Sequence, residues 1–175
     1  MAYTLSNDIV SLRAVEREDL DTLYILENEM AEGGASVTAQ PVSRMILWKY
    51  IEDYSADIAA DKQLRLMICN AEGTAVGAVD ISDYDAVNRR GYVGISVLKS
   101  ERGKGYGKAA LELLCKYASL TLGLHQLAAQ VAVDNEPSRH LFTAVGFKTC
   151  GRLRSWLRKD GRFSDALLFQ KLFAE

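Results

Sequence analysis

The sequence predicts an α/β domain in which a mostly antiparallel sheet contains one parallel crossover. Residues 64–69 and 75–81 read as strands that flank the turn-rich tetrad 70–73, which is the pattern of an antiparallel hairpin. A buried strand at residues 92–98 leads through a glycine-rich turn into a helix and then into a strand at residues 126–133. That order favours a right-handed parallel crossover.

Length and composition indicate one globular domain. A chain of 175 residues can bury one substantial core, and no Pro- or Ser-rich linker divides it, so residues 1–175 are expected to form a single domain. No run approaches the roughly 18 apolar residues of a membrane span. Because the N-terminal segment lacks the order of a signal peptide, we expect a cytoplasmic protein with no membrane partner. A net charge of −2 gives no overall attraction to nucleic acid.

The cysteines and histidines form no recognisable metal or disulfide pattern. Cys69, Cys115 and Cys150 are widely spaced and include no C-x-x-C pair, so neither a disulfide framework nor a zinc site is expected. His125 and His140 have no spaced partner ligand. We therefore expect no catalytic metal.

The first third of the chain predicts a strand and two helices. Residues 9–14 alternate as a strand does, and acidic residues at 15–20 favour a helix start there. This helix should fade around Met30. A second helix is expected after Pro41, because apolar residues recur at helical intervals: Met45, Ile46, Tyr50, Ile51, Tyr54 and Ile58.

The last third predicts a short helix and a hairpin. Asn135 is a good helix N-cap, with Pro137 tolerated in the first turn and Gly146 at the end. Two strands, 149–157 and 163–173, flank an Asp-Gly turn. The hairpin carries a cluster of basic residues: Arg152, Arg154, Arg158, Lys159 and Arg162. Charges that protect an edge strand explain this cluster more readily than an anionic partner does.

The turn between the buried strand and its helix carries the chemistry of a phosphate site. It consists of Arg102, Gly103, Lys104, Gly105, Tyr106 and Gly107. A helix start leaves backbone N–H groups without intrahelical partners and has the positive end of the helix dipole. Glycines let the main chain approach a ligand, and nearby basic residues, including Lys108, add positive charge. A phosphate or pyrophosphate is the expected ligand, although an ordinary glycine-rich turn would look similar.

Three phosphate-binding patterns compete for this turn. The P-loop pattern fails because Arg102 replaces its first glycine and Ala109 replaces its hydroxyl residue. The dinucleotide pattern G-x-G-x-x-[GA] is satisfied from Gly105 onward, but polar residues 99–102 separate the strand from the glycines and no series of βαβ repeats follows. The third pattern, [QR]-x-x-G-x-[GA], is filled by Arg102, Gly105 and Gly107.

This third pattern resembles the turn of the GNAT superfamily of acetyl-CoA-dependent N-acetyltransferases. A second matching string is Asn135-x-x-Ser138-x-x-Leu141-Phe142-x-x-x-Gly146-Phe147, and the resemblance extends over nearly the whole chain. It implies the GNAT fold: a mixed, mostly antiparallel sheet of about seven strands with a splayed parallel pair, flanked by about four helices. Leu12-Arg-x-x-Glu-Arg-Glu-Asp-Leu20 looks like the spermidine N-acetyltransferases. Tyr92-Val-Gly94 is instead similar to the ribosomal-protein alanine N-acetyltransferases.

The resemblance implies acetyl-CoA as cosubstrate. In GNAT proteins the last antiparallel strand has a bulge, which falls here near Ile95 to Val97, and pantetheine pairs with the freed backbone groups. The Val97 N–H would then donate to the oxyanion. The implied cofactor-binding residues are Ile95, Val97, Arg102, Gly103, Lys104, Gly105, Tyr106, Gly107, Lys108, Asn135, Ser138 and Phe142.

Proton transfer is the harder part to assign. An alkyl ammonium of pKa ~10.4 is neutral only about once in 2,500 at pH 7, so a base is useful. We expect Asp83 first, with Asp80 or Asp85 as alternatives, although Asp83 and Asp85 also suit a turn. At the position of Phe142, many GNAT enzymes have a tyrosine that acts as the general acid and protonates the CoA thiolate. Ser138 is the best substitute, unless the thiolate leaves unaided or Ser138 merely caps its helix.

The acceptor is expected to be a primary amine, either of a polyamine-like molecule or of a protein N-terminus. The implied substrate-binding residues are Glu27, Glu29, Glu32, Asp80, Asp83 and Tyr92, with Asp53 and Asp57 on the second helix as further acids. A solvated acidic helix surface is the alternative for each carboxylate. A non-catalytic acyl-CoA-binding regulator and a nucleotide-binding oxidoreductase remain alternative functions. A homodimer is possible.

Overall fold

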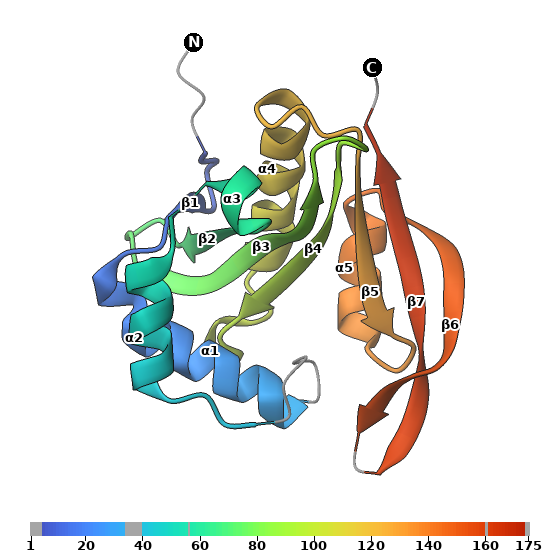
Figure 1. The fold of residues 1–175 in the computed structure, drawn as a ribbon, viewed down its shortest axis with the longest axis horizontal. Helices are drawn as coiled ribbons and strands as arrows, with labels where there is room; N and C mark the ends of the chain where they lie inside the picture. The colour runs from blue at the N-terminus through green and yellow to red at the C-terminus, as the bar shows by residue number, and fades with distance from the viewer. Residues whose placement is uncertain (1–4, 34–39, 56, 160, 174–175) are drawn as a thin grey trace.

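The computed structural model describes residues 5–33, 40–55, 57–159 and 161–173, without the side chains of residues 30–33. A seven-stranded sheet forms its centre, with the strand order β1-β2-β3-β4-β5-β7-β6 (Figure 1). All neighbouring strands run antiparallel except β4 and β5, which are parallel. The predicted fold class is therefore confirmed.

The strands follow the predicted hairpins closely. Their bounds are β1 Ser11–Ala14, β2 Leu64–Cys69, β3 Ala75–Asp85, β4 Arg90–Val97, β5 Gln126–Ala132, β6 Lys148–Lys159 and β7 Arg162–Leu172. β5 lies between β4 and β7, so the last hairpin joins the sheet through β7. This leaves the basic strand β6 as an edge strand, as its charges suggested.

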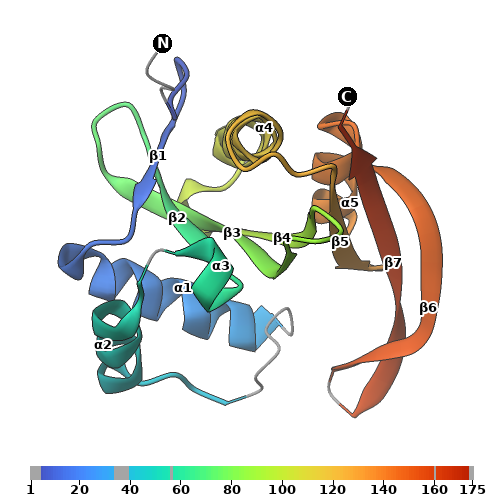
Figure 2. The ribbon, with the colours of Figure 1, turned by 45° about the horizontal axis from the view of Figure 1, so that its top comes forward.

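Helices pack against both faces of the sheet. Their bounds are α1 Leu20–Gly33, α2 Arg44–Asp53, α3 Ile58–Asp61, α4 Tyr106–Leu120 and α5 Glu136–Ala144, with short 3-10 turns η1 Arg17–Asp19 and η2 Lys99–Glu101. α1 and α2 lie on one face, and α4 and α5 lie on the other (Figure 2). We call these the α1/α2 face and the α4/α5 face.

Alternation along the strands fills a core on each face. On β2, Leu66 and Ile68 point into the larger core under α4 and α5, while Met67 and Cys69 point into the smaller core under α1 and α2. Both sets are buried, because β2 is covered on both faces. The larger core also takes the apolar stripe of α4, which includes Ala110.

The second predicted helix differs from the structure in two ways. Met45 and Ile46 were expected on its apolar face, yet they are exposed, and Leu47 is the buried residue that packs against α1. The helix also ends at Asp53 rather than continuing through Ile58. Apolar residues occur on several sides of this helix, so spacing alone could not identify the buried stripe.

A new short helix follows instead. The carboxylate of Asp57 accepts hydrogen bonds from the N–H groups of Ala59 and Ala60, which starts α3. Asp57 was named as a possible substrate-attracting acid, and its carboxylate serves as this cap. Among the described helices, none is long and apolar enough to cross a membrane.

Candidate active site

The parallel strands β4 and β5 pair over a short stretch and then diverge. Arg90–Tyr92 of β4 pair with Gln126–Ala128 of β5, and no later pair joins the two strands within the described residues. β4 nevertheless continues to Val97 and β5 to Ala132. The predicted splayed pair is therefore present, and we call the gap beyond Tyr92 the slot.

Backbone N–H groups of β4 point into this slot. The Leu98 N–H donates to the Val76 carbonyl at 3.0 Å, which fixes residues 98 and 76 as a hydrogen-bonded pair. Such pairs alternate along an antiparallel ladder, so Val97 and Ile95 direct their N–H and C=O groups away from β3. A hydrogen bond from Arg102 is consistent with this orientation of Val97: the Arg102 Nε donates to the Val97 carbonyl at 3.0 Å.

The predicted bulge near Ile95 to Val97 is wrong. Over residues 92–97, all of which the structure describes, β4 pairs with β3 without a shift in register. The irregularity lies on β3 instead, between Ser82 and Asp85. The slot therefore arises because β5 turns away from β4, rather than because β4 is kinked.

The glycine turn presents its backbone to solvent. Gly103 and Gly105 have φ of 79° and 84°, which favours glycine, and a Cβ at either would meet no atom within 4 Å. Gly105 is the N-cap of α4 and provides no side chain for capping, and the first helical bond runs from the Ala109 N–H to the Gly105 carbonyl. In the described part of the chain, the N–H groups of residues 103–108 have no protein acceptor. The turn can therefore receive an anion.

The basic side chains of the turn are partly engaged. The Lys104 ammonium lies 2.9 Å from the Glu101 carboxylate, and this hydrogen bond raises the pKa of Lys104. The Lys108 ammonium lies 3.8 Å from the Glu112 carboxylate. Both pairs are exposed, so an incoming diphosphate can compete with them. The half-buried Tyr106 packs against the larger core.

Gly107 brings the turn against the slot. A Cβ at Gly107 would lie 3.6 Å from Leu141 and 3.9 Å from both Ile95 and Val97. The start of α4 thus sits beside the end of β4 that is not paired with β5, where α5 also approaches. A ligand bound at the turn can extend directly into the slot.

The start of α5 lies on the same side. The Asn135 carboxamide accepts a hydrogen bond from the Ser138 N–H at 3.2 Å, so the predicted N-cap is confirmed. Ser138 itself is half-buried. Phe142 is only 3% exposed and packs on Phe147 and Phe169, so this ring belongs to the core. The expected contact of the Phe142 ring with the cofactor is not supported by this burial.

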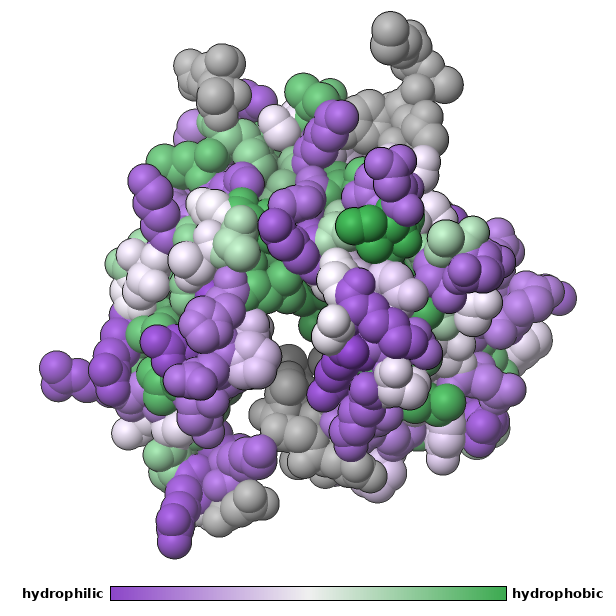
Figure 3. Space-filling model, turned by 180° about the vertical axis from the view of Figure 1, so that it is seen from behind, coloured by the Kyte–Doolittle hydropathy of each residue, from purple (hydrophilic) through white to green (hydrophobic). Residues whose placement is uncertain are grey.

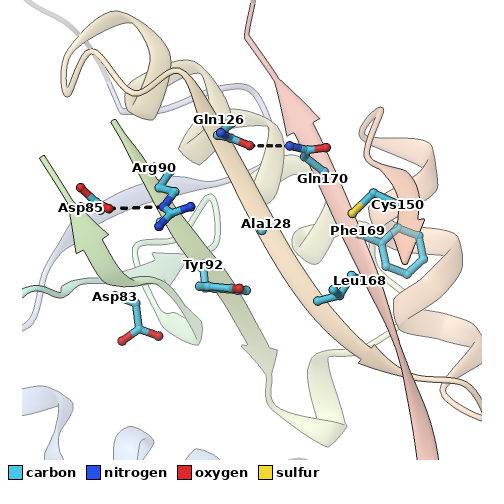
Figure 4. A pocket seen from close by; sticks show the side chains of 11 residues that line it. Asp83, Asp85, Arg90, Tyr92, Gln126, Ala128, Cys150, Leu168, Phe169 and Gln170 are labelled. Carbon is cyan, nitrogen blue, oxygen red and sulfur yellow. Dashed lines mark hydrogen bonds and ion pairs between the residues drawn. The ribbon is translucent and has the colours of Figure 1, made fainter. Parts of the chain in front are cut away.

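A cavity of about 390 Å³ opens on the α1/α2 face beside the paired end of the slot. Its lining comes from β3, β4, β5, β6 and β7, and includes Asp83, Tyr92, Gln126, Leu168 and Gln170 (Figure 4). The carboxamides of Gln126 and Gln170 hydrogen-bond each other at 2.5 Å. Seen from behind, the molecule is hollowed between the half with β6 and β7 and the half with α1 (Figure 3).

The candidate bases on β3 have different surroundings. Asp85 accepts hydrogen bonds from the backbone and side chain of Asn88, which lower its pKa, and it lies 3.4 Å from Arg90. Its expected turn role is confirmed. Asp83 is exposed with φ of 49°, and its carboxylate has no partner among the residues that the structure describes.

The two other acids near the slot are paired with a residue that sequence reasoning missed. Arg65 Nε lies 2.5 Å from Asp80 Oδ1, and Arg65 Nη1 lies 2.9 Å from Glu27 Oε1. Burial lowers the pKa of Arg65, but Asp80 and Glu27 raise it by more. Arg65 is therefore charged, and its guanidinium occupies the Asp80 carboxylate.

The remaining predicted acids lie elsewhere. Glu29 accepts a hydrogen bond from the Lys99 N–H at 3.2 Å, which connects α1 to the segment before the glycine turn. The side chain of Glu32 lies outside the described residues. Asp53 is exposed at the end of α2. In the described part of the chain, no group of three or more His, Cys, Asp or Glu could hold a metal ion.

Comparison with known proteins agrees with this geometry. Residues 10–148 match the family described as the acetyltransferase (GNAT) domain, and the chain belongs to this family. It is accordingly an N-acetyltransferase that uses acetyl-CoA to acetylate an amine. Family membership removes the nucleotide-binding oxidoreductase alternative.

Individual relatives are distant but cover most of the chain. The spermidine N(1)-acetyltransferase of Escherichia coli K12 is 28% identical over 167 residues, covering 90% of this chain and 83% of the relative. The putative ribosomal N-acetyltransferase YdaF of Bacillus subtilis is 28% identical over 168 residues, covering 88% and 92%. The structure of spermidine N-acetyltransferase from Vibrio cholerae with CoA and spermine is similar with a TM-score of 0.82 and 25% identity, covering 95% and 96%.

Proposed function

We propose that acetyl-CoA lies with its diphosphate on the N–H groups of residues 103–108 and its thioester arm in the slot. One observation carries the proposal: unpartnered N–H groups of the glycine turn adjoin a strand whose N–H groups at Ile95 and Val97 face a gap. An anion site beside an opened sheet suits a diphosphate followed by a peptide-like arm. The whole chain then serves as one acetyltransferase domain.

The acceptor amine enters from the opposite side, through the cavity on the α1/α2 face. Asp83 and Tyr92 line this cavity, and Tyr92 is the last residue of β4 that pairs with β5. Cofactor and acceptor therefore meet at the slot from the two faces of the sheet. This arrangement supports direct attack in a ternary complex, because both reactants can be bound at once.

A polyamine-like polycation is the first candidate acceptor. Two of the relatives described above are named for spermidine, and the Vibrio cholerae protein was crystallised with spermine. The exposed carboxylate of Asp83 gives an ammonium group a partner in the cavity.

The amine of a protein N-terminus is the second candidate. Beside Asp83, the cavity offers the neutral carboxamides of Gln126 and Gln170, which suit a peptide backbone as well as an amine. Arg65 also occupies both Glu27 and Asp80, which reduces the negative charge available to a polycation.

The chemical steps use few groups of the chain. Asp83, directly or through water, takes a proton from the ammonium, and the neutral nitrogen then attacks the thioester carbon. A β4 N–H that faces the slot beyond Tyr92 stabilises the resulting oxyanion. The C–S bond breaks as the carbonyl re-forms, and the nitrogen passes its second proton to water. The thiolate receives a proton from Ser138 or, with a pKa near 8.5, leaves unaided.

Cofactor binding is tested with a matched pair of glycine variants. Gly103 and Gly73 have φ of 79° and 81°, and a Cβ at either meets nothing within 4 Å, so alanine strains both turns equally. Gly103→Ala is expected to weaken acetyl-CoA binding at least tenfold in calorimetry, and Gly73→Ala to leave it unchanged. Equal affinities in the two variants would place the diphosphate elsewhere.

Catalysis is tested with an amine panel and a thiol-release assay. Asp83→Asn is expected to lower kcat/KM at least tenfold, while Asp53→Asn, an exposed acid on α2, changes it less than twofold. If neither Asp83→Asn nor Asp80→Asn has a tenfold effect, the base assignment is wrong. Acetyl-CoA binding without turnover of any amine would instead identify a non-catalytic acyl-CoA-binding protein.

A further inference from the structure

Arg65 joins three elements at the acceptor side of the slot. Its guanidinium contacts Asp80 on β3 through two nitrogens, at 2.5 and 3.5 Å, and Glu27 on α1 at 2.9 Å. The side chains of the three residues are between 15% and 22% exposed. We call Arg65, Glu27 and Asp80 the charge triad.

α2 holds the triad from a third direction. The Tyr54 hydroxyl accepts a hydrogen bond from the Arg65 N–H at 2.7 Å, and the Arg65 guanidinium lies 5.3 Å from the centre of the Tyr50 ring. A cation over an aromatic face is attracted to it. Arg65 is therefore held in place by the backbone and the ring as well as by its two carboxylates.

The triad lies beside the point where the slot begins. Asp80 pairs with Gly94 across β3 and β4, and Asp80 Oδ2 lies 3.8 Å from the position that a Gly94 Cβ would take. Gly94 is two residues beyond Tyr92, the last residue of β4 that pairs with β5. Residues opposite one another in a sheet share a face, so Asp80 and Tyr92 both stand on the α1/α2 face.

The charges of the triad decide what an approaching amine encounters. Two carboxylates alone would present a charge of −2 beside the slot, and the guanidinium reduces it to −1. A bidentate guanidinium is hard for a mobile ammonium to displace, because its geometry is already organised. Asp83 is then the carboxylate in the described cavity lining that can receive an acceptor ammonium without displacing hydrogen bonds.

We propose that Arg65 is a positioning residue that sets acceptor preference, by holding Glu27 and Asp80 in pairs and so limiting the number of ammonium groups recognised beside the slot. The proposal rests on the proposed function, in which the acceptor enters from this face. When Arg65 is lost, kcat/KM is expected to rise for polycationic amines relative to other acceptors. Acceptors with a single ammonium group, including a peptide N-terminus, change little because Asp83 suffices for them.

The experiment compares a triamine with a monoamine in wild type, Arg65→Gln and Arg65→Lys. The ratio of the two kcat/KM values is expected to rise at least tenfold in favour of the triamine in Arg65→Gln. In Arg65→Lys it stays within threefold of wild type, because the positive charge remains. A purely structural role would lower both kcat/KM values together and leave their ratio unchanged.

Arg13→Gln is the matched control. Arg13 also makes a two-nitrogen contact with a buried carboxylate, Asp19, at 2.7 and 2.8 Å, but it lies on β1 at the far edge of the sheet. It is expected to destabilise the fold without changing the acceptor ratio. A ratio in Arg65→Gln within twofold of wild type, or an equal rise in Arg13→Gln, overturns the proposal.

A second variant decides the matter if Arg65→Gln does not fold. Glu27→Gln leaves the contact between Arg65 and Asp80 intact and brings the triad to neutrality. The triamine-to-monoamine ratio should then fall at least threefold, and an unchanged ratio contradicts the proposal. If wild type binds acetyl-CoA but acetylates no amine, the proposed function fails, which is a different outcome from an unchanged ratio.

Discussion

The two halves of the sheet are built differently on the α1/α2 face. Under α1, the β1–β4 half places Met67 and Ala78 on this face, at 0% and 5% exposure. The β5–β7–β6 half places Gln130 and Gln170 on the same face, and no described helix covers them there (Figure 2). One half thus has two cores, and the other has a single core and a polar surface.

This difference is consistent with the proposed position of the site. A polar face left open is available to substrates, whereas a face filled with apolar side chains serves stability. The slot and the cavity lie where the covered half meets the open half, so one wall is covered by α1 and the other is not covered by a described helix. The glycine turn reaches the other end of the slot from the α4/α5 face.

Equivalent truncations in the two halves should give the largest contrast. Met67→Ala removes a fully buried side chain between β2 and α1, and is expected to lower the free energy of unfolding by about 2–5 kcal/mol. Leu168→Ala removes a half-exposed side chain from the cavity lining of β7, and should cost about 1 kcal/mol or less. Urea denaturation measures both. Equal losses would mean that the open half is packed as tightly as the covered one.

The cysteines provide a second contrast, in alkaline solution. Burial raises the pKa of the Cys115 thiol from 9.0 to about 11, so the folded state keeps a proton that the unfolded state loses. The associated stability is present below pH 9 and is lost between pH 9 and about 11, a change of up to roughly 3 kcal/mol. Cys115→Ala should therefore show a shallower loss of stability over this interval than Cys150→Ala, whose cysteine is exposed on β6.

Thiol labelling checks the same assignment. Cys150 should react with a disulfide reagent in the native protein, and Cys69 and Cys115 only after unfolding. Rapid native labelling of Cys115 would contradict the burial described for α4.

The smallest effect on activity is expected from a substitution of Ser138, at the start of α5. Ser138→Ala keeps the N–H that donates to Asn135, so the helix start is preserved. A role in protonating the thiolate predicts a fall in kcat of less than tenfold, because that leaving group is already stable, with little change in the KM for acetyl-CoA. An unchanged kcat removes Ser138 from the mechanism.

Most of the fold was predictable, because hairpins and crossovers leave local signals. The tetrad 70–73 and the Asp-Gly turn at Gly161 fixed two hairpins, and Asn135 marked the start of α5. The buried side of α2 was not predictable, because it depends on where α1 lies. The separate helix α3 depends on one cap, Asp57, which the helical spacing of apolar residues concealed.

The site was predictable where it consists of backbone, and less so where it depends on pairing. Glycines indicate an exposed turn, so the exposed backbone of residues 103–107 was predictable from the sequence, and its role as a cofactor site remains a prediction. The ion pair between Asp80 and Arg65 was not predictable from the sequence. A register shift between Ile68 and Cys69 places Arg65 opposite Asp80, whereas a regular hairpin would place it opposite Val79. A single irregular residue in a strand thereby decides which charges meet.

The brief contact between β4 and β5 has a mechanical consequence. At its middle, a methyl group on Gly91 would lie 2.7 Å from Ile81 of β3 and 4.0 Å from Leu127 of β5, so Gly91 leaves no room for a side chain there. The contact can act as a pivot, because a small rotation of β5, β7 and β6 about it would change the width of the slot beside Val97 far more than the spacing beside Gly91. Substitutions in the distant β6–β7 hairpin can therefore alter the width of the slot, and with it the fit of the thioester arm proposed to lie there.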